Sequence, residues 1–197
     1  MMSTKMASVV TTTEVQVKQT CEVTIGDALP SDAAAIALIG ANTFTATFGF
    51  SVPENDLADF LAETYSSEAI EAEIISAHEN NISTFVARDE LGSILGFVQL
   101  VRGLTDPSLK GDPSSHAELR RLYVDTTAHG KGIGTKLISV VENKARSEGF
   151  KQLWLTVWED HKSAQRLYQR LGYSKVGAVE FPTGTCIQTD WVLVKSL

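Results

Sequence analysis

Residues 122–135 read LYVDTTAHGKGIGT and combine a predicted strand, a glycine-rich turn and the start of a helix. The glycines at 130, 132 and 134 let the backbone bend tightly and leave its N–H groups unobstructed by Cβ atoms. Because these N–H groups lie at the positive end of the following helix, the stretch predicts a binding site for an anion. Lys131 and Thr135 would add a charge and a hydroxyl to that site.

Two common phosphate-binding loops do not match this stretch. A Walker loop requires Lys followed by Ser or Thr, whereas Lys131 is followed by Gly132. A dinucleotide-binding loop requires a third glycine where Thr135 stands, and no acidic residue follows at the expected distance. The alternative without a ligand is a turn that only joins the strand to the helix.

The pattern around the loop predicts a mixed α/β domain. Strands and helices alternate along the chain: a strand at 118–124, a helix at 131–147, a strand at 151–158 and a helix at 162–171. A closing antiparallel pair of strands follows at 173–179 and 189–194. A strand–helix–strand unit of this kind is expected to form a right-handed parallel crossover.

The first half of the chain predicts helices followed by a hairpin. We expect a strand at 21–25, a helix at 33–44, a helix that opens at a capping box at 51–54, a helix from 67 onward, and a β-hairpin at 82–101. Residues 1–20 indicate a flexible arm with a short β segment at 15–17, so a single domain would span 21–197. The long polar loop at 103–115 is a candidate for contacting a substrate.

Composition narrows the function classes. Of the 197 residues 43% are hydrophobic and 21% charged, which is ordinary for a globular domain. A net charge of −7 argues against nucleic acid as the main partner and suits a site that attracts cationic amines. No apolar run approaches the ~20 residues that cross a bilayer, and the N-terminus lacks a secretion or transit signal. We therefore expect no membrane partner, a cytoplasmic setting with a nuclear one left open, and reduced thiols at Cys21 and Cys186.

The spacing His129-x-x-Gly132-x-Gly134 resembles the [QR]-x-x-G-x-[GA] pyrophosphate loop of GNAT N-acetyltransferases. His129 stands where that family usually has Gln or Arg; an imidazole can also donate to a phosphate oxygen, which would add some pH dependence. Residues 158–173 are similar to the family's N-x-x-A-x-x-[FY]-Y-x-x-x-G-[FY] segment, with His161 in place of Asn. PaiA-type spermidine/spermine acetyltransferases have segments that resemble 44–48, 51–55, 118–124, 154–159 and 188–190.

This resemblance implies a fold, a coenzyme and a set of residues. The expected fold is the α/β GNAT fold, with a mixed central sheet of about seven strands, a splayed parallel pair, and about four to five flanking helices. The coenzyme would be acetyl-CoA, with no metal, and the superfamily leaves a homodimer open. The residues expected to bind the coenzyme are Leu122, Tyr123, Val124, His129, Gly130, Lys131, Gly132, Ile133, Gly134, Thr135, His161 and Ala164.

Amine acetylation requires three chemical groups. An alkylammonium with a pKa near ~10.4 must lose a proton, the thioester oxygen needs a hydrogen-bond donor, and the leaving thiol, whose pKa in water is ~8.5, needs a proton. The resemblance assigns the acid to Tyr168, whose alternative role is packing against the sheet.

The resemblance assigns the base to Glu118, which lies eleven positions before His129 and would act through water. The alternative is that the Glu118 carboxylate pairs with Arg120 or Arg121, in which case the base would be Asp190, Glu159 or ordered water.

The family's hydrogen-bond donor to the thioester oxygen is a main-chain N–H at a bulge, expected here in the strand that ends at Tyr123 and Val124. Pantetheine would insert between this strand and 155–158 and pair with the backbone of Leu122 and Val124. Trp154 and Trp158 are expected to serve as core and cleft wall rather than as a cage for a cation.

Three functions remain open from the sequence. The first is acetylation of a primary amine of a small molecule by direct attack in a ternary complex, with a polyamine favoured. The second is acetylation of a protein or peptide, which needs an open cleft, whereas a pocket closed by 44–60 and 103–115 would favour a small amine. The third is a non-catalytic acyl-CoA-binding sensor.

Overall fold

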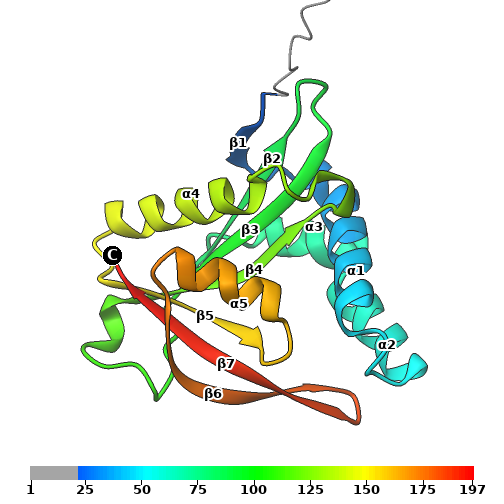
Figure 1. Ribbon diagram of the computed structural model, residues 1–197. Coiled ribbons are helices and arrows are strands. Elements are labelled where there is room, and N and C mark those ends of the chain that lie inside the picture. The colour runs from blue at the N-terminus through cyan, green and yellow to red at the C-terminus, as the bar shows by residue number, and fades with distance from the viewer. Residues whose placement is uncertain (1–21) are drawn as a thin grey trace, which may run out of the picture.

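The computed structural model describes residues 22–197, so the predicted arm at 1–20 and Cys21 lie outside the described residues. The described chain contains seven strands and five α-helices (Figure 1). The strands are β1 Thr24–Asp27, β2 Ile82–Arg88, β3 Ile94–Arg102, β4 His116–Val124, β5 Gln152–Trp158, β6 Ser174–Thr183 and β7 Cys186–Ser196. The helices are α1 Ala33–Phe48, α2 Glu54–Thr64, α3 Ser67–Ile75, α4 Ile133–Ser147 and α5 Lys162–Arg170.

All seven strands form one mixed sheet. Their order is β1-β2-β3-β4-β5-β7-β6, and the neighbours are antiparallel except β4 and β5, which are parallel. Helix α4 connects this parallel pair, as the strand–helix–strand pattern predicted. The expected mixed sheet of about seven strands is therefore confirmed.

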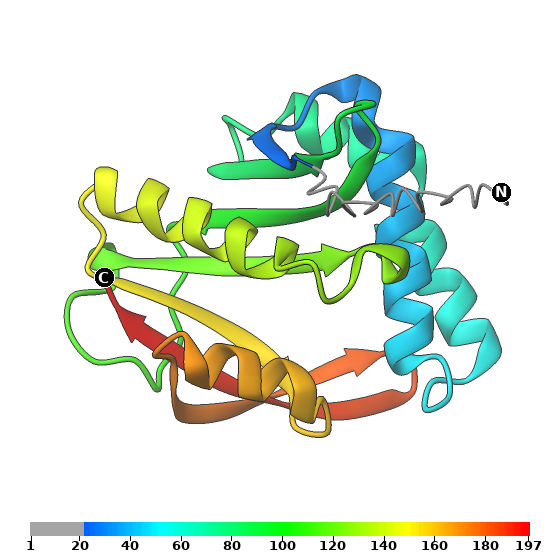
Figure 2. The ribbon, with the colours of Figure 1, turned by 45° about the horizontal axis from the view of Figure 1, so that its top comes forward.

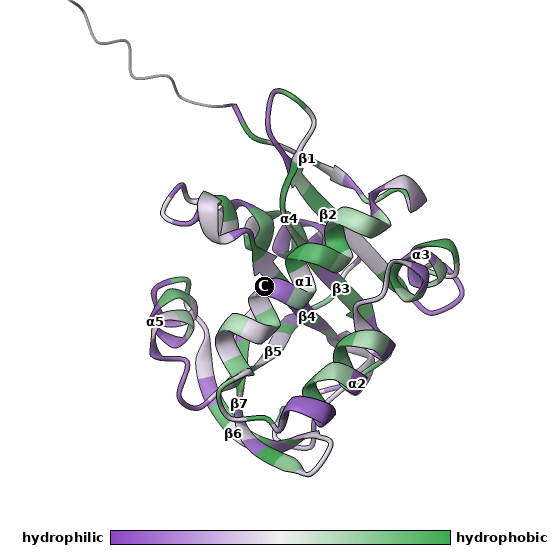
Figure 3. Cartoon of the chain, turned by 90° about the vertical axis from the view of Figure 1, so that its right-hand side faces the viewer, coloured by the Kyte–Doolittle hydropathy of each residue, from purple (hydrophilic) through white to green (hydrophobic). Residues whose placement is uncertain are grey.

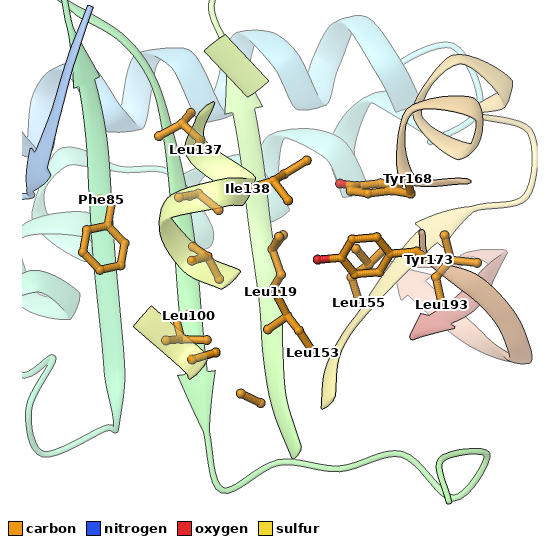
Figure 4. Packing of buried hydrophobic residues seen from close by; sticks show 14 of the residues in the cluster. Phe85, Leu100, Leu119, Leu137, Ile138, Leu153, Leu155, Tyr168, Tyr173 and Leu193 are labelled. Atoms are coloured by element: carbon orange, nitrogen blue, oxygen red, sulfur yellow. The ribbon is translucent and has the colours of Figure 1, made fainter. Parts of the chain in front are cut away.

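Each face of the sheet carries its own hydrophobic core. Helices α4 and α5 lie on one face, where Leu137 and Ile138 pack against Leu119, Leu153 and Leu155 (Figures 2 and 4). Helices α1 and α3 cover the other face, with apolar residues such as Ile36, Ile70 and Phe97. Strands β2 and β3 are hydrophobic along much of their length (Figure 3) because helices cover them on both faces.

Several element boundaries differ from the predicted ones for local reasons. The first strand begins at Thr24, and α1 continues to Phe48 because Thr45 and Thr47 do not interrupt its hydrogen bonds. The predicted capping box before α2 is wrong: the Ser51 hydroxyl donates to the Phe48 carbonyl, and α2 starts after Pro53 without a side-chain cap. Helix α3 does have a cap, because Ser66 accepts a hydrogen bond from the Ala69 N–H.

Helix α4 begins at Ile133, two residues later than predicted. Gly132 precedes it with φ 75°, a left-handed conformation that an L-residue with a Cβ rarely adopts. The glycine-rich turn therefore stays outside the helix. None of the helices within 22–197 has the length and apolar character needed to span a membrane.

We expect Leu137→Ala to lower the free energy of unfolding by about 2–5 kcal/mol, because the substitution leaves a cavity in the core between α4 and the sheet. Leu137 is 0% exposed, whereas Leu38 on α1 is 62% exposed and provides a matched control. Urea denaturation should show a change within about 0.5 kcal/mol for Leu38→Ala. Equal losses for the two variants would contradict the packing described here.

Candidate active site

The parallel strands β4 and β5 are joined only at their first three residue pairs. His116, Ala117 and Glu118 pair with Gln152, Leu153 and Trp154, and among the described residues the pairing goes no further. Beyond Glu118 the two strands separate. Backbone groups of 119–124 that face β5 therefore have no strand partner there, and an extended ligand with amide groups can pair with such an edge.

A bulge in β4 lies at this point of separation. Leu100 of β3 pairs with Leu119, whereas Val98 pairs with Leu122, so Arg120 and Arg121 together stand opposite one residue, Gln99. A bulge bends its strand and increases the local twist, which directs the rest of β4 away from β5. The bulge expected before Tyr123 and Val124 is therefore present.

Contacts from α3 and its neighbourhood hold the bulged part of β4. Arg121 Nη1 donates to Glu73 Oε1 at 3.1 Å, and the Arg121 guanidinium lies 5.3 Å from the ring centroid of Tyr65. The Tyr65 hydroxyl donates to Tyr123 Oη at 3.0 Å, and Gln99 Nε2 donates to Glu73. Sequence reasoning missed Glu73, Tyr65 and Gln99, because their positions in the chain carry no signal of this long-range network.

A cavity of about 170 Å³ opens where β4 and β5 separate. Five of the residues expected to bind the coenzyme or to catalyse transfer line it: Leu122, Tyr123, His161, Ala164 and Tyr168. Trp158, expected as cleft wall, and Asp190, the alternative base, line it as well. The other predicted residues, Glu118, Val124 and 129–135, do not line it. Lining residues that no motif marks include Thr43 and Phe181.

The glycine-rich turn lies between the end of β4 and the start of α4. Gly130 and Gly132 both have φ 75°, and open space surrounds the position of a Cβ at either residue. The N–H groups of residues 130–135 donate no hydrogen bond to another described residue, because the first donor in this part of the helix is Lys136. Such a row of unpaired N–H groups at a helix N-terminus fits a phosphate group.

His129 makes a contact that the motif did not predict. Its Nε2 lies 3.0 Å from the carbonyl oxygen of Val124, so the imidazole is placed at the end of β4. The ring is exposed, and it bridges the strand to the glycine-rich turn.

Tyr168 reaches the cavity from α5. Its ring centroid lies 5.7 Å from that of Tyr173, and both hydroxyls point toward β4 (Figure 4). Burial raises the pKa of the Tyr168 phenol above its usual range, with a smaller contribution from Tyr123. The phenol is therefore protonated at neutral pH and able to donate a proton. The packing role considered as the alternative is also present, since Tyr168 belongs to the core between α5 and the sheet.

Glu118 lies at the last pair of β4 with β5, outside the cavity lining. Arg120 Nη2 donates to Glu118 Oε2 at 3.2 Å, which is the pairing considered as the alternative to a catalytic role. Burial raises the pKa of the Glu118 carboxyl, and the charges of Arg120 and Arg121 oppose this effect.

His161 and Asp190 complete the polar lining at the end of β5. Burial lowers the pKa of the His161 imidazole, so the ring is neutral at physiological pH. Burial raises the pKa of Asp190 to about 6; the neighbouring Thr156 hydroxyl opposes this effect and Glu159 adds to it. Asp190 is thus still ionised at neutral pH.

The loop at 103–115 does not lie where the sequence predicted. It packs at the opposite end of β4, where Lys110 O accepts from Gln152 Nε2 at 2.7 Å and Thr105 Oγ1 lies 2.7 Å from His116 Nδ1. None of its residues lines the cavity. The expectation that this loop closes the pocket is therefore wrong.

The tip of the β6–β7 hairpin contacts α2 and the segment that precedes it. Asp56 of α2 accepts hydrogen bonds from the N–H and the hydroxyl of Thr185, at 2.7 and 2.6 Å. Gln188 Nε2 donates to Ser51 Oγ at 2.8 Å. These contacts, which we call the hairpin clasp, join Asp56 of α2, and Ser51 in the segment between α1 and α2, to the hairpin. Like the loop at 103–115, the residues of the clasp do not line the cavity.

Comparisons with known proteins agree with this geometry. An uncharacterized N-acetyltransferase of Lactobacillus delbrueckii is 29% identical over 81% of this chain and 88% of its own. The spermine/spermidine N(1)-acetyltransferase of Bacillus subtilis is 29% identical over 46% of this chain and 59% of its own. The crystal structure of a PaiA N-acetyltransferase from Thermoplasma acidophilum in complex with coenzyme A has a TM-score of 0.70 at 20% identity, and covers 89% of this chain and 99% of that one.

The family comparison decides the identity. A sequence profile described as the acetyltransferase (GNAT) family matches residues 50–173, which is more than half of the chain and contains the glycine-rich turn, the split between β4 and β5, and Tyr168. The protein therefore belongs to the acetyltransferase (GNAT) family and is an N-acetyltransferase, as the motifs around His129 and His161 predicted.

Proposed function

We propose that the protein transfers an acetyl group from acetyl-CoA to a primary amine of a small molecule, with polyamines as the favoured acceptors, by direct attack in a ternary complex. The observation that carries this proposal is the continuous path from the free N–H groups of 130–135, along the open edge of β4, to the cavity at Tyr168. The N–H groups can bind an anion, the open strand edge can bind an extended chain, and Tyr168 can donate a proton. A long thioester with phosphates at its far end requires these three features in this order.

The chain's own groups fit coenzyme A along this path. The N–H groups of 130–135 would hold the pyrophosphate, with Lys131 and Thr135 beside them. The open edge of β4 at 119–124 would pair with the pantetheine amides. His161 and Ala164 lie at the cavity end of the path. The related PaiA structure named above contains coenzyme A.

Acetyl-CoA supplies the activated carbonyl and the leaving thiol. A main-chain N–H of the β4 bulge, ahead of Tyr123 and Val124, would donate to the carbonyl oxygen as negative charge develops on it. Tyr168 would donate the proton of its hydroxyl to the departing sulfur, since burial keeps the phenol protonated until the thiolate forms. Glu118 would reach the amine only through water, because Arg120 holds its carboxylate outside the cavity lining.

The size of the cavity favours a small acceptor. A cavity of about 170 Å³ is close to the ~150 Å³ that accommodates benzene, so it has room for the reacting end of a small amine. A polyamine is supported further by the net charge of −7 and by the Bacillus subtilis relative.

We expect the purified protein to release free thiol from acetyl-CoA in the presence of spermidine or spermine, and more slowly with aminosugars, amino acids and short peptides. Tyr168→Phe should lower kcat by about 100-fold, which is the scale of a lost general acid. Tyr173→Phe is the matched control, because the Tyr173 hydroxyl is bound to Glu142 in the core and should leave kcat within threefold. Turnover of peptides alone would contradict the small-amine assignment.

Gly132→Ala should weaken coenzyme A binding by about 5–30-fold, because an alanine at φ 75° costs about 1–2 kcal/mol and the loop would lose its cradle shape. Calorimetric titration of coenzyme A measures this effect. Gly26→Ala serves as the control: its Cβ would also meet no atom within 4 Å, yet its φ is not positive. Unchanged affinity in Gly132→Ala would show that the turn does not hold the pyrophosphate.

A further inference from the structure

Asp190 is the one carboxylate among the described residues that line the cavity. It lies on β7, where it pairs with Trp158 of β5 and with Val179 of β6. This position is at the end of β5 that has separated from β4. Asp190 lines the cavity that opens where β4 and β5 separate.

The charges around the cavity leave Asp190 without a cationic partner. Arg120 is bound to Glu118 at 3.2 Å and Arg121 to Glu73 at 3.1 Å, so both guanidinium groups that line the cavity are neutralised by carboxylates outside it. Within 22–197, Asp190 makes no ion pair. The cavity consequently carries one uncompensated negative charge, which favours a cation.

Aromatic rings stand on the same side of the cavity. The ring centroid of Trp158 lies 5.4 Å from that of Phe48 and 5.8 Å from that of Phe50, which is 78% exposed. Phe48 and Trp158 both line the cavity. Ring faces attract an alkylammonium and pack against its methylene groups, so this wall suits an aliphatic chain that ends in a charged nitrogen.

We propose that Asp190 receives the ammonium group of the acceptor and takes its proton, with Phe48, Phe50 and Trp158 holding the alkyl chain. In this step one N–H bond of the ammonium breaks, an O–H bond forms on the carboxylate, and the freed electron pair on nitrogen attacks the thioester carbonyl. Asp190 later releases the proton to water. This inference rests on the proposed acetyl transfer and assigns the base to Asp190 in place of Glu118.

The surroundings of Asp190 suit a base that works at neutral pH. Burial raises the pKa of Asp190 to about 6, so the carboxyl is ionised above that pH and protonated below it. The charged or titratable groups around it are Glu159 after β5 and those that line the same cavity: Tyr123 of β4, His161 before α5, Tyr168 of α5, and the paired Arg120 and Arg121. Because activity needs the ionised form, kcat/KM should fall as the pH drops through about 6.

The test compares two amines of nearly equal shape that differ in charge. Ethylamine is an ammonium ion at pH 7.5, whereas 2,2,2-trifluoroethylamine is already neutral and has no proton to lose before attack. We expect Asp190→Asn to lower kcat/KM for ethylamine by about 100-fold, the scale of a lost general base, and for trifluoroethylamine by less than tenfold. The acid limb near pH 6 should disappear from the ethylamine profile of this variant.

Two variants serve as controls for this comparison. Glu118→Gln should leave the ratio of the two amines unchanged, and Tyr168→Phe should slow both amines equally. Coenzyme A affinity and thermal melting of Asp190→Asn should match those of the unsubstituted protein, which shows that the variant is folded.

The outcomes separate the two proposals. If the unsubstituted protein acetylates amines and Asp190→Asn keeps kcat/KM for both amines within threefold, the role of Asp190 is overturned. Acetyl transfer itself then still stands. A fall in kcat/KM for ethylamine, but not for trifluoroethylamine, in Glu118→Gln would return the base to Glu118. Absence of turnover with every amine in the unsubstituted protein would overturn acetyl transfer itself, and the role of Asp190 with it.

Discussion

The early separation of β4 from β5 is the constraint on which the rest of the structure depends. Only three residue pairs join these parallel strands before the bulge at Arg120 and Arg121 turns β4 away. Separation leaves backbone N–H and C=O groups without partners, which costs free energy unless a ligand or water satisfies them. The contact of Arg121 with Glu73 and that of Tyr123 with Tyr65 hold β4 in this position. An open backbone edge is thus built into the sheet.

Electrostatics inside the cavity follow from how the ion pairs are arranged. Each arginine that enters the cavity lining is bound to a carboxylate outside it, and so contributes little net charge to the cavity. The effective dielectric constant in such a site is lower than in water, so the remaining charge of Asp190 acts strongly on a nearby ammonium. The neutral state of His161 and Tyr168 leaves that charge unopposed. Burial thus favours the neutral form of all three groups, because it raises the pKa values of Asp190 and Tyr168 and lowers that of His161.

Local patterns predicted much of this structure, and long-range contacts account for what they missed. The glycine spacing at 130–134 predicted the turn before α4, where Gly130 and Gly132 have positive φ, since such a turn depends only on backbone conformation and on the helix that follows. The capping box at 51–54 failed because Ser51 is bound to Phe48 and Gln188 instead. The hairpin clasp, through Asp56 and Thr185, connects residues 129 positions apart and has no local signature.

A crystal structure of the protein with coenzyme A tests the central claim most directly, namely that the separated strands and the glycine-rich turn form one coenzyme site. We expect the pyrophosphate on the N–H groups of 130–135, the pantetheine amides paired with the β4 edge at 119–124, and the sulfur within hydrogen-bond reach of the Tyr168 hydroxyl. A coenzyme bound elsewhere, or one whose sulfur lies far from Tyr168, would contradict this account of the site.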